Sequence, residues 1–108
     1  MLIVMTTVPE KAAAEVLAEM IVDARLAACV QILPQITSIY VWEGEVQKEG
    51  EHLLLIKTLP EKWEELRDFI AANHTYSVPE IVAIDAENVS ESYLHWLGKV
   101  VAIEAKNI

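Results

Sequence analysis

Two stretches of this chain match each other at an offset of 51 residues: Leu2-Ile3-Val4-Met5-Thr6-Thr7-Val8-Pro9-Glu10-Lys11 and Leu53-Leu54-Leu55-Ile56-Lys57-Thr58-Leu59-Pro60-Glu61-Lys62. Each begins with an apolar run and ends in Thr, an apolar residue, Pro, Glu and Lys. The Thr hydroxyl can cap the first free amides of a helix, Pro suits the first turn, and a Glu three residues after the Thr completes a capping box. Both copies therefore predict a buried strand that leads into a capped helix.

The residues after each copy have helical periodicity. Apolar side chains recur at steps of three and four, which predicts an amphipathic helix in both places. They are Ala13, Val16, Leu17, Met20, Ile21 and Ala24 in the first, and Trp63, Leu66, Phe69 and Ile70 in the second, which should end near Asn73 and His74. A β-rich run follows each helix, over 28–33 and 81–84. The order is therefore strand, helix, strand, twice over.

A hairpin is predicted between the two units. The run 37–46 has strand composition, and we place the turn in the polar segment 47–50, which ends in Gly50. Pro34-Gln35 should break or bulge the preceding strand, because Pro cannot donate to a ladder. A last helix is predicted from the pattern Asn88-x-x-Glu91 and the apolar residues that follow it.

This order predicts an α+β fold of the ferredoxin-like βαββαβ type, with an added C-terminal helix, as one domain over residues 1–108. Its single antiparallel sheet would carry helices on one face. The apolar side chains on the other face would meet water unless further subunits cover them. We therefore expect an oligomer.

Composition and charge narrow the classes of function. The chain has 108 residues, 8 Lys plus Arg against 17 Asp plus Glu, and a net charge of −9, so it lacks the basic footprint of nucleic-acid binding. No apolar run approaches the roughly 18 residues of a membrane helix, and we expect neither nucleic acid nor membrane as a partner. The N-terminus has no basic region, and the lone Cys29 fits a reducing compartment, so we expect a cytoplasmic protein.

The sequence contains none of the strong catalytic or nucleotide-binding motifs. The three glycines lie away from the strand-to-helix turns that hold phosphates, and there is no Gly-x-Ser-x-Gly, Cys-x-x-Cys or His-Glu-x-x-His. No nucleophile, base and orienting group can be assembled from spacing. We expect a protein that is not an enzyme.

Two places contain candidate ligands. Cys29 lies among small apolar residues, where it serves either as a buried thiol or as a soft donor to a metal such as copper. Before the last strand, His74, Tyr76 and Glu80 form the densest polar and aromatic segment outside a helix. His74 could equally favour a helix C-terminus, and Glu80 could be a surface charge. Tyr40 and Trp42 share one strand face, and we expect them to pack against a neighbouring subunit rather than stack on a ligand.

The chain resembles the CutA family of divalent-cation tolerance proteins over nearly its whole length. Blocks of sequence in the same order and spacing carry the resemblance: Thr7-Val8-Pro9, Arg25-Leu26-Ala27-Ala28-Cys29-Val30-Gln31, Ser38-Ile39-Tyr40-Val41-Trp42-Glu43-Gly44, Lys57-Thr58, His74-Thr75-Tyr76-Ser77-Val78-Pro79-Glu80-Ile81 and Tyr93-Leu94-x-Trp96.

The resemblance implies a ferredoxin-like subunit in a homotrimer, cytoplasmic in bacteria, that binds copper or another divalent metal. It also implies structural kinship to PII-like signalling proteins, which bind small effectors between subunits. The family segment places His74, Tyr76, Pro79 and Glu80 in this chain, and its Ala-Ala-Cys-Val block places Cys29. Thr6 and Thr75 stand where metal-associated relatives can carry Cys and Pro, which weakens a transferred soft-metal site.

Three hypotheses follow. The first is a trimeric binding protein for divalent metal, with His74 as the leading ligand and Cys29 as the second. The alternatives are a PII-like sensor with a small effector near Tyr76 and Glu80, and a structural scaffold that presents its hairpin to a partner.

Overall fold

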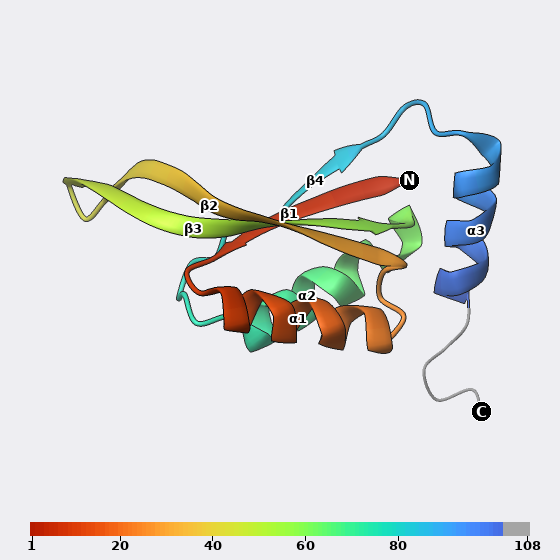
Figure 1. Cartoon of the computed structure of the whole chain (residues 1–108), viewed down its shortest axis with the longest axis horizontal. Helices are drawn as coiled ribbons and strands as arrows, with labels where there is room; N and C mark the ends of the chain where they lie inside the picture. The colour runs from red at the N-terminus through yellow and green to blue at the C-terminus, as the bar shows by residue number, and fades with distance from the viewer. Residues whose placement is uncertain (103–108) are drawn as a thin grey trace.

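A computed structural model describes residues 1–102 of the chain, and residues 103–108, the end of the predicted single domain, lie outside the described part. The elements are β1 (Leu2–Val8), α1 (Lys11–Asp23), β2 (Cys29–Trp42), β3 (Glu45–Thr58), the 3₁₀ turn η1 (Pro60–Lys62), α2 (Trp63–Asn73), β4 (Val82–Asp85) and α3 (Glu91–Ala102). The strands form one antiparallel sheet in the order β2-β3-β1-β4, and α1 and α2 cover one face of it (Figure 1). The predicted ferredoxin-like α+β fold is confirmed.

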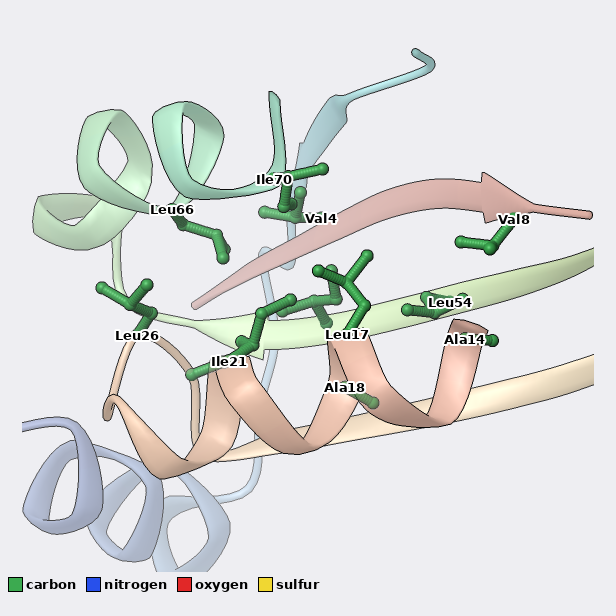
Figure 2. Packing of buried hydrophobic residues seen from close by; sticks show 12 residues of the cluster. Val4, Val8, Ala14, Leu17, Ala18, Ile21, Leu26, Leu54, Leu66 and Ile70 are labelled. Atoms are coloured by element: carbon green, nitrogen blue, oxygen red, sulfur yellow. The ribbon is translucent and has the colours of Figure 1, made fainter. Parts of the chain in front are cut away.

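The internal repeat lies at the centre of the sheet. Its two strand copies, β1 and β3, are neighbours and pair antiparallel from Leu2 with Thr58 to Val8 with His52. Alternate residues of these strands point toward the helices, so that Val4, Leu54 and Ile56 are fully buried. Leu17 and Ile21 of α1 and Leu66 and Ile70 of α2 meet them in the core shown in Figure 2.

The capping boxes predicted from the repeat are wrong. The N-cap of α1 is Glu10, and no side chain hydrogen-bonds to its first turn. The second copy begins with the 3₁₀ turn η1, and α2 starts only at Trp63. The predicted Asn88 cap also differs, because α3 begins at Glu91, with the Leu94 amide donating to the Ser90 carbonyl.

Thr58 forms a buried hydrogen bond instead of capping a helix. Its side chain is fully buried, and its hydroxyl donates to the Leu26 carbonyl at 2.7 Å. A buried hydroxyl needs such a partner, and this one ties the end of β3 to the connection between α1 and β2. Thr6 is also fully buried, but its Oγ1 has no hydrogen-bond partner among the described residues.

These two threonines give opposite predictions for the same substitution. Thr58→Val should lower the free energy of unfolding by about 1–2 kcal/mol, because it leaves the Leu26 carbonyl unpaired. Thr6→Val should raise it by about 1 kcal/mol, because it removes an unpaired buried hydroxyl. Urea titration of both variants measures the difference, and two shifts of the same sign would contradict these hydrogen-bond assignments.

The hairpin turn lies four residues earlier than predicted. Strand pairing continues to Trp42 with Glu45, and the turn is Glu43-Gly44, with φ of +51° and +81°. Two left-handed central residues are typical of the tight turn that matches strand twist, and Gly44 adopts this conformation without a Cβ penalty. The predicted turn at 47–50 is therefore wrong, and these residues belong to β3. The predicted break at Pro34-Gln35 is confirmed by a register shift between Leu33 and Ile36.

Because of this turn, β2 and β3 extend well past β1 and β4. We call their outer parts, residues 36–42 and 45–51, the arm (Figure 1). At the opposite end of the sheet, α3 packs through Leu97 and Val101 against Ala28, with Met1 and Leu59 beside them.

The sheet face away from α1 and α2 is apolar where β1 meets β4. Ile3 pairs with Ile84 and Met5 with Val82, so these side chains share that face. Val82 and Ile84 are 45% and 50% exposed. We call this surface the open face, and it is the surface that the sequence analysis expects further subunits to cover.

Candidate functional site

A cleft of about 730 Å³ lies between the arm and the segment that joins α2 to β4. The arm supplies Ser38, Ile39, Tyr40 and Trp42 from β2 and Gln47, Glu49 and Glu51 from β3, and the other walls are formed by Thr7, Thr75, Tyr76, Ser77, Val78 and Glu80. Three carboxylates and three large aromatic rings therefore face it, and its described lining contains no Lys, Arg or His. The size is that of a site for a small organic molecule.

Strand alternation explains how the arm presents these residues. Ser38 pairs with Glu49 and Tyr40 pairs with Gln47, so that alternate residues of both strands share the face that lines the cleft. The opposite face of the arm carries Ile39, Val41 and Val46, which are 67%, 68% and 73% exposed. Ile39 also touches the edge of the cleft.

His74 holds in place the segment between α2 and β4, which forms the wall of the cleft opposite the arm. As predicted, α2 ends at Asn73, and His74 is its C-cap with extended backbone. Its Nε2 lies 2.8 Å from the Thr7 carbonyl, and its Nδ1 accepts from the Tyr76 amide at 3.1 Å. Since a carbonyl only accepts, the Nε2 must carry the proton. Both ring nitrogens of His74 are therefore engaged, and no lone pair is free for a metal in this arrangement.

Tyr76 joins the two walls of the cleft. Its hydroxyl donates to Glu51 Oε2 at 2.8 Å, and its ring lies 4.9 Å from that of His74. Burial raises the pKa of Tyr76, and the hydrogen bond to Glu51 and the charges of Glu51 and Glu49 raise it further. Tyr76 therefore remains a neutral donor at neutral pH, and its acceptor Glu51 is only 5% exposed.

Cys29 lies at the other end of the sheet. It begins β2 opposite Lys57, whereas His74 is bonded to Thr7, which pairs with Leu53. The Cys29 thiol is half-buried and forms no disulfide. Tyr93 lies beside it, and the pKa of Tyr93 is raised by burial and by the neighbouring Cys29. One subunit does not bring His74 and Cys29 together, and residues 1–102 hold no group of three His, Cys, Asp or Glu side chains that could bind a metal.

The other predicted site residues lie in the cleft. Tyr76 and Glu80 are brought together there, as are Tyr40 and Trp42, which were expected in an oligomer interface. That interface stays a prediction for Tyr40 and Trp42, while the face behind them exposes Ile39, Val41 and Val46.

Two cleft residues, Glu49 and Glu51, were missed by the sequence analysis. Placing the turn at 47–50 removes Glu49 from a strand and leaves Glu51 only as the first residue after the turn. The alternation Glu45-x-Gln47-x-Glu49-x-Glu51 was the signal that could have found them, because a period of two puts these side chains on one strand face.

The fold and the cleft define a class: a ferredoxin-like subunit with an open apolar sheet face and an acidic, aromatic cleft beside a long hairpin. The family model described as CutA1 divalent ion tolerance protein matches residues 2–100. The chain belongs to this CutA1 family. No helix in the described residues has both the length and the apolar character needed to span a bilayer.

Three comparisons illustrate the relationship. The divalent-cation tolerance protein CutA of Thermus thermophilus is 45% identical over 95 residues, which are 88% of this chain and 92% of that one. The chloroplastic protein CutA of Arabidopsis thaliana is 47% identical over 96 residues, 89% of this chain but 53% of the plant protein, so the chain spans about half of that relative. A solved structure described as the periplasmic divalent cation tolerance protein CutA of Archaeoglobus fulgidus superposes with a TM-score of 0.90 at 36% identity, covering 94% of this chain and 99% of that one.

Proposed function

We propose that this protein acts in divalent-cation tolerance as a cytoplasmic homotrimer that binds copper without catalysing a reaction. Membership of the CutA1 family supports the role in tolerance. The observation that carries the trimer is the open face, where Val82 and Ile84 leave about half of their surface in water. Burying such a face between subunits is favourable in proportion to the apolar area removed from water.

A shared site follows from the positions of the donors. Within one chain His74 and Cys29 are apart, but in a trimer each residue occurs three times around an axis or beside a neighbour's side chains. Cys29 is the softer ligand and the better match to copper, and it must lose its proton to bind. His74 must first release the Tyr76 amide from Nδ1. The single cysteine of the chain also fits the proposed reducing compartment, which cell fractionation tests.

Copper titration tests this proposal. Under anaerobic conditions the unmodified protein should bind copper as a trimer, and Cys29→Ser should weaken binding at least tenfold, with a smaller loss in His74→Ala. His95→Ala is the matched control, since His95 is exposed on α3. Equal affinity in all four proteins would reject both ligands, and a monomer in sedimentation at micromolar concentration would reject the shared site.

The cleft favours a second candidate, a PII-like sensor of a small molecule. The supporting observation is the volume of about 730 Å³ with Tyr76 and Glu80 in its wall. A molecule that binds only the folded protein should raise the melting temperature without any metal present, by mass action. A thermal-shift screen in the presence of chelator therefore separates this role from metal binding.

A further inference from the structure

We propose that each subunit of the homotrimer places its Lys57 in the acidic cleft of the next subunit, where the ammonium group pairs with the carboxylates of Glu49 and Glu51. This inference rests on the proposed homotrimer and names the residue that a second copy of the chain contributes to the cleft. The cleft of a single subunit is incomplete without it.

Lys57 and the two carboxylates share one continuous face of the sheet. Lys57 pairs with Ile3, which lies beside Ile84 on the open face. Side chains alternate along β3, so Glu51 and Glu49, six and eight residues before Lys57, point to the same side and line the cleft where this face continues onto the arm. At about 3.4 Å per residue these separations are roughly 20 and 27 Å. Lys57 therefore cannot reach either carboxylate of its own subunit.

Lys57 carries a positive charge at an otherwise apolar end of this face. Its side chain is half-buried, its neighbours on the adjacent strands are Ile3 and Cys29, and its ammonium nitrogen lies 5.7 Å from the centre of the Tyr93 ring. It belongs to none of the ion pairs of residues 1–102. An aromatic ring stabilises a cation only modestly, and an ammonium group that leaves water without a carboxylate is costly. The favourable occupant of this end is therefore a carboxylate of the covering subunit.

Glu49 and Glu51 present the matching negative charge. Glu51 is almost completely buried in one subunit, and Tyr76 donates to its Oε2. This hydrogen bond from a neutral hydroxyl satisfies one oxygen but supplies no positive charge. Glu49 is exposed in the same cleft, and neither glutamate belongs to an ion pair of the described residues. When a neighbouring subunit covers the cleft, a cation from that subunit keeps both charges from being buried unpaired.

Threefold symmetry would bring the two ends of this face together. Every interface in a closed ring of three is head-to-tail, so it joins two different patches of the same chain. A face with a cation at one end and carboxylates at the other offers such a pair of patches. Contact between like ends would set Glu49 and Glu51 against their own copies, and juxtaposed like charges disfavour an interface. A second copy of this chain therefore complements the cleft in charge.

Exchange of the two charges in the full chain tests the pairing. Sedimentation velocity over a concentration series, at about 0.15 M salt, measures the dissociation constant of the trimer. Lys57→Glu should weaken association at least tenfold, because it sets a further carboxylate against Glu49 and Glu51. Glu49→Lys in the same chain should then recover most of that loss, because opposite charges face each other again. The two positions are too far apart within a subunit for this recovery to arise inside one chain.

Lys57→Glu combined with Glu64→Lys is the matched control. It has the same net charge as the exchanged pair, but Glu64 is exposed on α2, in the helix layer on the other side of the sheet (Figure 1). This control should associate as weakly as Lys57→Glu alone. Equal recovery by Glu64→Lys and Glu49→Lys would reduce the effect to net charge and overturn the pairing. A Lys57→Glu variant that associates as tightly as the unmodified protein would overturn it too.

Carbodiimide coupling of the unmodified protein gives a second test that depends on no destabilising variant. The reagent joins an ammonium group to a carboxylate in contact with it. Mass spectrometry of mixed chains with and without a heavy-nitrogen label should find Lys57 linked to Glu49 or Glu51 of a different chain. Lys57→Arg keeps the charge but does not couple, so it should remain trimeric and lack this product.

The outcomes separate this pairing from the trimer on which it rests. A trimer that lacks the Lys57 product overturns the pairing and leaves the proposed trimer standing. An unmodified protein that sediments as a monomer at micromolar concentration overturns both.

Discussion

Leu54→Ala is expected to lower the free energy of unfolding by about 2–5 kcal/mol, the range for truncation of a fully buried leucine. Leu54 lies on β3 at 0% exposure and belongs to the core cluster between the sheet and the helices, together with Leu17 of α1 (Figure 2). The neighbouring helix and strand are held by many other contacts, so they cannot collapse fully into the space left behind. Since domains of this size have total stabilities of about 5–15 kcal/mol, this is a large share.

Guanidinium unfolding at one fixed protein concentration measures this loss. Val16→Ala is the control, because Val16 is apolar and on α1 but 56% exposed, and it should change stability by less than about 0.5 kcal/mol. A Leu54→Ala variant as stable as the control would mean that the two helices do not pack on this face of the sheet.

Ile84→Asp is expected to dissociate the proposed homotrimer. Ile84 lies on the open face beside Ile3, and in a single subunit its side chain is half exposed, so the substitution should be tolerated by an isolated chain. When that face is covered by a neighbour, each subunit would bury an unpaired carboxylate in an apolar interface. The penalty is several kcal/mol per charge, enough to shift micromolar protein from trimer to monomer.

Sedimentation velocity across a concentration series measures the association. Val16→Asp adds the same charge to an exposed apolar position on the outer side of α1, and it should leave the oligomer unchanged. If Ile84→Asp and the unmodified protein sediment alike as trimers, subunits meet elsewhere, and the exposed back of the arm with Ile39, Val41 and Val46 becomes the next surface to test.

The order of elements was predictable because it depends on local patterns. The repeat at an offset of 51 residues located β1 and β3, and helical spacing located α1 and α2. Capping was not predictable to the same extent. Thr58 has the right neighbours for a cap, yet its hydroxyl bonds Leu26, 32 residues away, because its side chain points into the core. Such a competing partner is visible only after the chain is folded.

The candidate site shows the same division. His74, Tyr76 and Glu80 could be singled out because polar and aromatic residues cluster in one short segment. The hydrogen bonds of His74 could not be predicted, since its Nε2 is paired with the carbonyl of Thr7, which is far away in the sequence, and its Nδ1 with the amide of Tyr76. Glu51 escaped notice because it is buried through its contact with Tyr76, and burial of a charged residue in the polar part of β3 cannot be read from the sequence.

The sequence by itself determined the fold class, the order of strands and helices and the family, because hydrophobic periodicity and ordered blocks of residues are local features of the chain. The tertiary structure alone decided where the arm turns, which carboxylate is buried and that Cys29 and His74 lie at opposite ends of the sheet. These properties depend on contacts between residues far apart in sequence, where a two-residue turn and a shared strand face bring Glu49, Glu51 and Tyr76 to one cleft.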